Sequence, residues 1–239
     1  MGFLKTPYLP QGRVIVAVGD VENAAAEVVK PFCLATLPPS MQHHADLSLC
    51  YLGKGVAVCA PEAYAYYNEK LACWNVKLIK GEKSVGSNYP CDAAYNVAIV
   101  GKRLFCKVAI TDRVLLNEAK KLGYKIININ QGYAKCSVCP VDENSAISAD
   151  MSFYKAAVKE GIDVLRITNE GIILKGFANG FFGGAAYCSK SGVLKAKGDM
   201  TTPPEYTKIK EFLNKRGMKI EEDVGAVTDF GSFIPLCEE

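Results

Sequence analysis

The chain has 239 residues, of which 49% are hydrophobic, so it can bury a sizeable core, and we expect one domain over residues 1–239. Its 28 basic and 25 acidic residues give a formal net charge of +3 and are interspersed, which argues against a nucleic-acid or membrane-surface partner. The sequence shows neither a membrane-spanning apolar run nor a signal-peptide core, so we expect a cytoplasmic protein.

The 10 cysteines are scattered through apolar segments of a chain that is too large to need disulfides for its stability. Cysteine is among the residue types most often buried. We therefore expect most of these cysteines to act as small hydrophobic core residues, with no structural disulfide.

The first unit of the chain contains one strand, one helix and a second strand. The β-branched run Arg13–Val18 predicts the first strand, the alanine-rich stretch Val21–Val29 predicts a short helix, and Phe32–Leu37 predicts the second strand. Pro38 and Pro39 then interrupt regular structure. Only one strand precedes the helix in this unit.

The second and third units each begin with a hairpin, followed by a helix and a further strand. In the second unit the expected elements are Asp46–Leu52, Val56–Ala60, the helix Glu62–Ala72 and the strand Trp74–Ile79. In the third they are Asp92–Val100, Leu104–Ile110, the helix Asp112–Leu122 with Thr111 as its N-cap, and Lys125–Ile129.

The fourth and fifth units follow the same order. The fourth contains strands Cys136–Val141 and Ser145–Ala149, an N-cap at Asp150, the helix Met151–Glu160 and the strand Ile162–Ile167. The fifth contains Ala185–Cys188, Val193–Ala196, a helix from Pro203-Pro204 to Arg216, and Met218–Glu221.

The helices recur with a period of roughly 45 residues, which is typical of a repeat architecture. A lone strand, Gly231–Leu236, remains at the C-terminus, while the first unit lacks a strand. The sequence therefore predicts an α/β fold, a five-bladed β/α-propeller that is closed by pairing of its terminal strands, since closure removes exposed sheet edges. A Rossmann-type sheet would leave the hairpins unexplained and would need a GxGxxG loop, which the sequence lacks.

Several motifs resemble a known superfamily. They are HADLSLC at His44–Cys50, YPCDAAYN at Tyr89–Asn96, QGYAKCSVCPVDEN at Gln131–Asn144, FFGGAA at Phe181–Ala186 and DFGSFIPL at Asp229–Leu236. Together with the five repeats, they resemble the pentein (β/α-propeller) superfamily of guanidino-group-modifying enzymes, and more narrowly an uncharacterised bacterial, clostridial-type pentein-like family. The pentein fold also includes translation initiation factor six, so the resemblance implies the fold more strongly than an activity.

In a ring of repeats, equivalent positions converge on the axis, so the residues that open each hairpin should meet at one mouth. These candidate site residues are His44, Asp46, Asp92, Lys135, Cys136, Gly183, Gly184, Asp229 and Ser232. Core packing alone does not require carboxylates, an imidazole and a thiol at corresponding positions of the repeats.

His44 and Asp46 stand two positions apart, so on a strand both side chains would face the mouth. The spacing resembles the His-x-Asp of arginine deiminases, which implies an imidazole acting as general acid and base and a carboxylate that binds the substrate guanidinium. The alternative is a hydrogen-bonded structural histidine.

Two cysteines are candidate nucleophiles. Cys136 lies beside Lys135, whose charge would favour a thiolate. Cys188, in GGAAYC, resembles the Gly-Gly-Gly-x-x-Cys nucleophile motif of agmatine and arginine deiminases, although the third glycine is missing. A third alternative is that both thiols are core residues and the protein has no nucleophile.

Cys136 and Cys139 form a CxxC pair, but a strand would direct the two thiols to opposite faces, and no second ligand pair has zinc-site spacing. We therefore expect no metal and no other cofactor. Gly183 and Gly184 favour close approach of backbone or ligand.

The leading hypothesis is a Cys/His hydrolase or amidinotransferase that acts on a small cationic or guanidino compound. Cys136, His44 and Asp46 would be catalytic, while Asp92, Lys135, Gly183, Gly184, Asp229 and Ser232 would bind the substrate. The alternative hypothesis is a non-catalytic binding module resembling translation initiation factor six, or a catalytically inactive pentein. A homodimer is compatible with the sequence.

Overall fold

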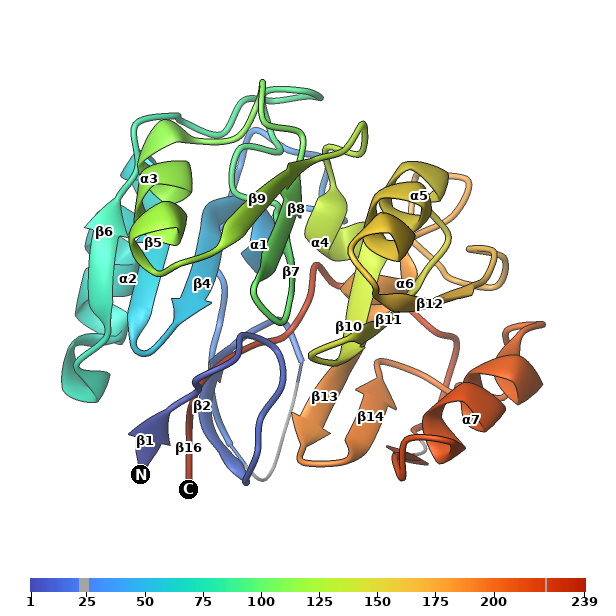
Figure 1. The fold of residues 1–239 in the computed structure, drawn as a ribbon. Helices are drawn as coiled ribbons and strands as arrows, with labels where there is room; N and C mark the ends of the chain where they lie inside the picture. Colours follow the sequence, from blue (N-terminus) through green and yellow to red (C-terminus); the bar gives the residue numbers. More distant parts are fainter. Residues whose placement is uncertain (22–25, 222) are drawn as a thin grey trace.

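The computed structural model describes residues 1–21, 26–221 and 223–239, and its strands form five small sheets (Figure 1). We number these sheets as blades 1 to 5, in the order of the first strand of each along the chain. Blades 2 to 5 share one pattern, in which two antiparallel strands are followed by a third strand parallel to the second.

The strands of these four blades have the following bounds. Blade 2 contains β4 (Leu49–Gly53), β5 (Val56–Cys59) and β6 (Lys77–Lys80), and blade 3 contains β7 (Ala98–Val100), β8 (Arg103–Cys106) and β9 (Lys125–Asn128). Blade 4 contains β10 (Val138–Asp142), β11 (Ser145–Ser148) and β12 (Asp163–Arg166), and blade 5 contains β13 (Ala186–Lys190), β14 (Val193–Ala196) and β15 (Lys219–Glu221).

Blade 1 combines both ends of the chain. Its strands β1 (Gly2–Phe3), β16 (Ile234–Glu238), β2 (Val14–Val18) and β3 (Glu27–Val29) lie side by side in that order. β16 pairs antiparallel with both β1 and β2, and the two termini lie next to each other (Figure 1). The prediction that the C-terminal strand completes the first blade is confirmed.

Four longer helices lie at the periphery of the blades (Figure 1). They are α2 (Tyr64–Lys70), α3 (Arg113–Lys121), α5 (Met151–Lys159) and α7 (Tyr206–Asn214), and two 3₁₀ turns, Pro61–Ala63 and Ala72–Trp74, flank α2. Each of α3, α5 and α7 buries one apolar stripe, such as Leu115, Leu116 and Ala119 in α3. Asp112 and Asp150 cap α3 and α5 through side-chain bonds to backbone N–H groups.

Three one-turn helices lie toward the centre of the molecule. They are α1 (Ala45–Ser48), α4 (Ala134–Ser137) and α6 (Phe182–Ala185), and every residue in them is buried. Each runs directly into the first strand of its blade, β4, β10 or β13. The polar residues of these turns are therefore held inside the protein, where the blades meet.

The prediction for the first unit is wrong in two places. Glu27–Val29 forms strand β3 parallel to β2, where a helix over Val21–Val29 was expected, and residues 22–25 lie outside the described residues. Phe32–Leu37 contains a turn and no strand. β-branched residues favour strands, and a free sheet edge offers unpaired backbone groups to such a segment. Glu27–Val29 therefore forms a strand because it lies along the edge of β2.

The predicted first strands of the hairpins also begin too early. Asp46–Ser48 and Cys136–Ser137 are helical turns, and the predicted strand Asp92–Val100 is regular only from Ala98. The N-cap of α3 is Asp112, one residue after the predicted Thr111. Alternating apolar residues do not show where a strand is preceded by a single helical turn, because one turn is too short to show helical periodicity.

Two further observations concern membrane crossing and thiol pairing. Among the described residues, no helix is long and apolar enough to span a bilayer. All 10 cysteines are free thiols, and 7 of them are buried.

Candidate active site

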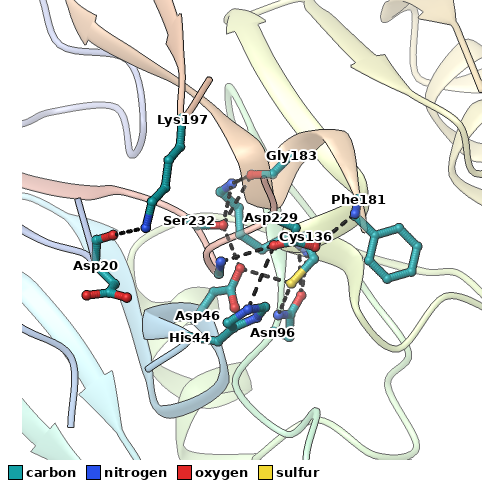
Figure 2. A network of polar contacts seen from close by, with 12 residues as sticks. Asp20, His44, Asp46, Asn96, Cys136, Phe181, Gly183, Lys197, Asp229 and Ser232 are labelled. Carbon is teal, nitrogen blue, oxygen red and sulfur yellow. Dashed lines mark hydrogen bonds and ion pairs between the residues drawn. The ribbon is translucent and has the colours of Figure 1, made fainter. Parts of the chain in front are cut away.

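Five chain segments, one from each blade, bring polar side chains together at the centre (Figure 2). His44 caps the start of α1, Asp46 lies in α1, Lys135 and Cys136 lie in α4, and Gly183 lies in α6. The other two segments, Asp92–Asn96 and Asp229–Ser232, precede β7 and β16. Most residues that the sequence nominated thus meet, and two of them, Asp46 and Ser232, share a hydrogen bond although they are 186 positions apart along the chain.

The carboxylate of Asp46 links three of these segments. Its Oδ2 accepts a hydrogen bond from the Cys136 thiol at 3.1 Å and another from the Ser232 hydroxyl at 2.5 Å. Its Oδ1 is buried and has no hydrogen-bond partner among the described residues. A buried acceptor without a donor is costly, so this oxygen is available to a ligand that carries N–H groups.

Lys135 does not contact the thiol as the sequence suggested. Its buried ammonium group donates to the Gly183 carbonyl at 2.8 Å and to the Ser232 hydroxyl at 3.0 Å, and it lies 4.9 Å from the centre of the Tyr8 ring. The lysine therefore holds α6 and Ser232 in place. The expectation that its charge produces a thiolate at Cys136 is wrong.

Asn96 is a site residue that sequence reasoning missed. Its Oδ1 accepts from the backbone N–H groups of Lys135 and Cys136, at 2.6 and 3.2 Å, and its Nδ2 donates to the Cys136 sulfur at 3.1 Å. This amide fixes both the start of α4 and the thiol. An alignment of the repeats would have shown it, because Ser48 and Ser137 also come just before the first strand of their blades.

His44 and Asp229 form the second half of the cluster. Nε2 of His44 lies 4.0 Å from Oδ1 of Asp229, and both ring nitrogens are buried without a hydrogen-bond partner in the described part of the chain. Asp229 accepts from the backbone N–H groups of Phe181 and Gly231. Gly231 has φ +75°, and a Cβ at this position would overlap both the imidazole and the Cα of His44, so a side chain there would displace His44.

Two nominated residues lie apart from the thiol. Asp92 accepts a hydrogen bond of 2.7 Å from the Tyr133 hydroxyl, and no bond joins it to Cys136, Asp46 or His44 among the contacts of the described residues. Cys188 lies in β13, where its thiol faces the Pro140 carbonyl of the neighbouring blade. The fold therefore places Cys136 in the polar cluster and Cys188 in the core.

Of the two glycines in α6, Gly184 packs tightly against the Asp229 carboxylate, and only a residue without a side chain fits there.

Burial controls the ionisation of the cluster. His44, Asp46, Cys136 and Asp229 each have an exposed fraction of 3% or less. Burial raises the pKa of Asp46, while His44 and Lys135 oppose this shift. The pKa of the Cys136 thiol lies well above its usual value, because the thiol is buried and faces the carboxylates of Asp46 and Asp229. Burial also raises the pKa of Asp92.

One group of described residues has the geometry to hold a metal ion. A ring nitrogen of His44, a carboxylate oxygen of Asp46 and the Cys136 sulfur lie within 4.8 Å of one another, and zinc accepts all three ligand types. In this structure the thiol of Cys136 donates a hydrogen bond to Asp46, its raised pKa disfavours the thiolate that would bind zinc, and the Lys135 ammonium bonds to Ser232 close by. The absence of a metal stays a prediction.

Solved structures of low sequence identity share this fold. An amidinotransferase of the saxitoxin biosynthetic pathway from Microseira wollei superposes with a TM-score of 0.55 at 11% identity, covering 98% of this chain and 97% of its own. Agmatine deiminase of C. jejuni gives 0.54 at 10% identity, covering 96% and 91%. A cysteine-to-serine mutant of DDAH from Pseudomonas aeruginosa, complexed with citrulline, gives 0.53 at 11% identity, covering 90% and 97%.

These likenesses define the class: the protein has the pentein fold, an α/β five-bladed β/α-propeller, as the sequence predicted. It belongs to the family of unknown function DUF6873, whose model matches residues 17–234. No curated protein matches the chain. The structural neighbours are guanidino-modifying enzymes, whereas the family description assigns no function.

Proposed function

We propose that the protein is a guanidino-group-modifying enzyme, a hydrolase or amidinotransferase, with Cys136 as nucleophile and His44 and Asp46 as its catalytic partners. The observation that carries this proposal is the carboxylate of Asp46. One of its oxygens accepts the thiol proton of Cys136, and the other is buried without a donor in residues 1–21, 26–221 and 223–239. A guanidinium has N–H donors that fit this free oxygen, and it would then lie against the sulfur.

The high pKa of the free thiol is compatible with this role. A bound guanidinium brings a positive charge next to the sulfur, which favours the thiolate. The thiol proton would pass to Asp46, its hydrogen-bond acceptor. The raised pKa of Asp46 makes it a better base than an ordinary aspartate.

The chemical steps then balance with the residues at hand. The Cys136 sulfur forms a bond to the guanidinium carbon, and a protonated His44, whose charge Asp229 stabilises at 4.0 Å, gives its proton to the leaving amine as the C–N bond breaks. The resulting thiouronium is attacked by water, or by an acceptor amine in the transferase case. His44 recovers its proton from that nucleophile, and the C–S bond breaks with the sulfur leaving as a thiolate. Asp46 then returns the proton that it took from Cys136, which restores the thiol, and in hydrolysis the second proton of the water leaves with the released amine.

The test is a turnover assay of the purified protein with L-arginine, methylated arginines and agmatine, with and without small amino acids as amidine acceptors. We expect a ureido product or a transferred amidino group, which Cys136→Ser abolishes. Cys188→Ser is the matched control, since it removes another buried cysteine outside the cluster, and should retain activity. Absence of turnover with every guanidine, or full activity of Cys136→Ser, would refute the proposal.

One observation favours a second candidate function, a non-catalytic binding module. The catalytic candidates are almost fully buried, with exposed fractions of 2% for His44, 1% for Asp46 and 3% for Cys136. A chloroacetamidine separates the two functions, because its amidine mimics a guanidine and its chloride leaves when a thiolate attacks. The enzyme should gain a covalent adduct at Cys136, located by peptide mass spectrometry, and a binding module should gain none there.

A further inference from the structure

A cleft leads from the surface to the His44 side of the cluster. It has a volume of about 340 Å³, within the range of small-molecule sites, and its walls include Pro39, Ser40, Lys197 and Phe230. His44 and Asp229 lie at its buried end, whereas Lys175 and Pro39 are exposed. This cleft is therefore a route by which a ligand could approach the cluster.

The inner end of this cleft carries polar groups without partners. Both nitrogens of His44 are buried and unbonded within the described residues, and one of them lies within 4.8 Å of the Cys136 sulfur. The carboxylate of Asp229 lies beside the imidazole. A guanidinium that reaches this end would meet the carboxylate of Asp229 and the imidazole of His44, and the Cys136 sulfur, which does not itself line the cleft, lies within 4.8 Å of that imidazole.

The side wall of the cleft carries a fixed positive charge. Lys197 in the segment after β14 donates one hydrogen bond of 2.8 Å to the backbone carbonyl of Asp20, and its ammonium lies 5.5 Å from the Phe230 ring (Figure 2). An ammonium group has three N–H donors, so two remain for a ligand. Asp20 also lines this cleft, but the contact printed between it and Lys197 is to its backbone carbonyl, and no ion pair joins Lys197 to a carboxylate among the described residues. Ser40 Oγ in the same cleft is buried and unpartnered within those residues.

We infer that this cleft selects guanidino compounds that also carry a carboxylate, with Lys197 and Ser40 binding that carboxylate and the guanidinium directed toward His44 and Asp229. The inference rests on the proposed function and specifies its substrate class. The positive charge at the wall and the negative charge at the inner end match the two ends of a guanidino amino acid. A guanidino amine, which is cationic at both ends, would place one ammonium group beside Lys197, where like charges repel.

The test compares L-arginine with agmatine, which has the same guanidinobutyl chain without the carboxylate. Binding is measured by titration calorimetry on Cys136→Ser protein, so that no turnover disturbs the equilibrium. We expect L-arginine to bind at least about 10-fold more tightly than agmatine, as a hydrogen bond to a charged group implies. Lys197→Met should remove this preference, because arginine loses the partner of its carboxylate and agmatine no longer meets a like charge, and Lys197→Arg should retain it.

The matched control is Lys195→Met, which removes a lysine two positions away that pairs with Glu221 and lies outside this cleft. It should leave the preference unchanged. Equal affinity for both ligands, or equal weakening of both by Lys197→Met, would overturn the carboxylate subsite while leaving the proposed function intact. If neither ligand binds to protein whose fold is verified by circular dichroism, the proposed function fails and the subsite fails with it.

Discussion

The Cys136 thiol donates a hydrogen bond of 3.1 Å to Oδ2 of Asp46, so a nucleophile candidate and a carboxylate share one proton inside the protein. Both side chains are buried, and the negative charge of the carboxylate adds to burial in raising the pKa of the thiol. The ligand-free protein therefore holds Cys136 as a neutral thiol. Activation must come from whatever enters the cluster.

Asp46→Asn should lower the pKa of Cys136, because it removes a negative charge and a hydrogen-bond acceptor that both favour the protonated thiol. The measurement is the rate of iodoacetamide labelling at Cys136 against pH, followed by peptide mass spectrometry. The exposed Cys33, Cys73 and Cys91 are first replaced by serine, because they would consume the reagent.

The midpoint of this pH profile should move to lower pH in Asp46→Asn. Asn96→Ala should move it the other way, because the Asn96 amide donates to the sulfur and lowers the thiol pKa. A profile that neither substitution moves would show that the two contacts do not control the thiol.

Asp46 also predicts how stability depends on pH. The pKa of Asp46 is raised in the folded protein, so as pH rises the unfolded chain loses this proton first, at a pKa of about 3.9. Above that pH the unfolded state gains stability relative to the folded state, and the contribution of Asp46 to folding is lost. The Tm of Asp46→Asn relative to wild type should therefore increase as pH rises from about 4 toward neutrality.

Asp199→Asn is a control of opposite sign. Hydrogen bonds from Thr201 lower the pKa of Asp199, so its contribution is lost as pH falls, and the Tm of this variant relative to wild type should decrease slightly with rising pH. If the two variants drift in the same direction, the assignment of the Asp46 shift is wrong.

Gly231→Ala should damage the site through His44. Gly231 has φ +75°, and an added Cβ would overlap the imidazole and the Cα of His44, so a methyl group both strains the backbone and displaces His44. Gly123→Ala is a matched control, because Gly123 has φ +79° with open space around it. Urea unfolding should show Gly231→Ala to be less stable than Gly123→Ala by about 1–3 kcal/mol, the usual cost of overpacking. Equal losses would mean that His44 moves aside freely.

Asn96→Ala should destabilise the whole protein. It leaves the buried backbone N–H groups of Lys135 and Cys136 without an acceptor, and each orphaned group costs about 1–3 kcal/mol. Asn128→Ala is the comparison, since Asn128 also accepts a backbone N–H, from Val108, but at an exposed position. Its loss should be a few tenths of a kcal/mol, because water replaces the missing acceptor. Similar losses in the two variants would show that Asn96 is structurally replaceable.

The sequence predicted the repeats and the pairing of the chain ends, because hairpin turns, helix caps and apolar stripes are local signals. Asp150, for example, was correctly identified as the N-cap of α5 from its position before an apolar helix. Glu27–Val29 was mistaken for helix, because its strand character depends on pairing with β2, a contact that local propensity does not encode.

The sequence predicted which residues lie in the site better than it predicted the contacts between them. Repeat equivalence brought His44, Asp46 and Cys136 together correctly. The expected spacing of His44 and Asp46 on a strand was wrong, since Asp46 lies in the helical turn α1 and His44 is the N-cap of that turn. The roles of Lys135 and Asn96 depend on side-chain directions between blades, which single-sequence reasoning does not supply. Catalysis by these residues stays a prediction.

Because β16 lies between β1 and β2, the first sheet is completed by a strand that follows the strands of all the other blades along the chain. During synthesis the edge of β2 that β16 will occupy has no native partner until β16 has been made, although blades 2 to 5 already have all their strands. We expect the docking of β16 to be a late step of folding. A circular permutant that joins the two termini and opens at the Lys190–Gly192 turn would make this last step local in sequence, and it should fold faster than the natural chain.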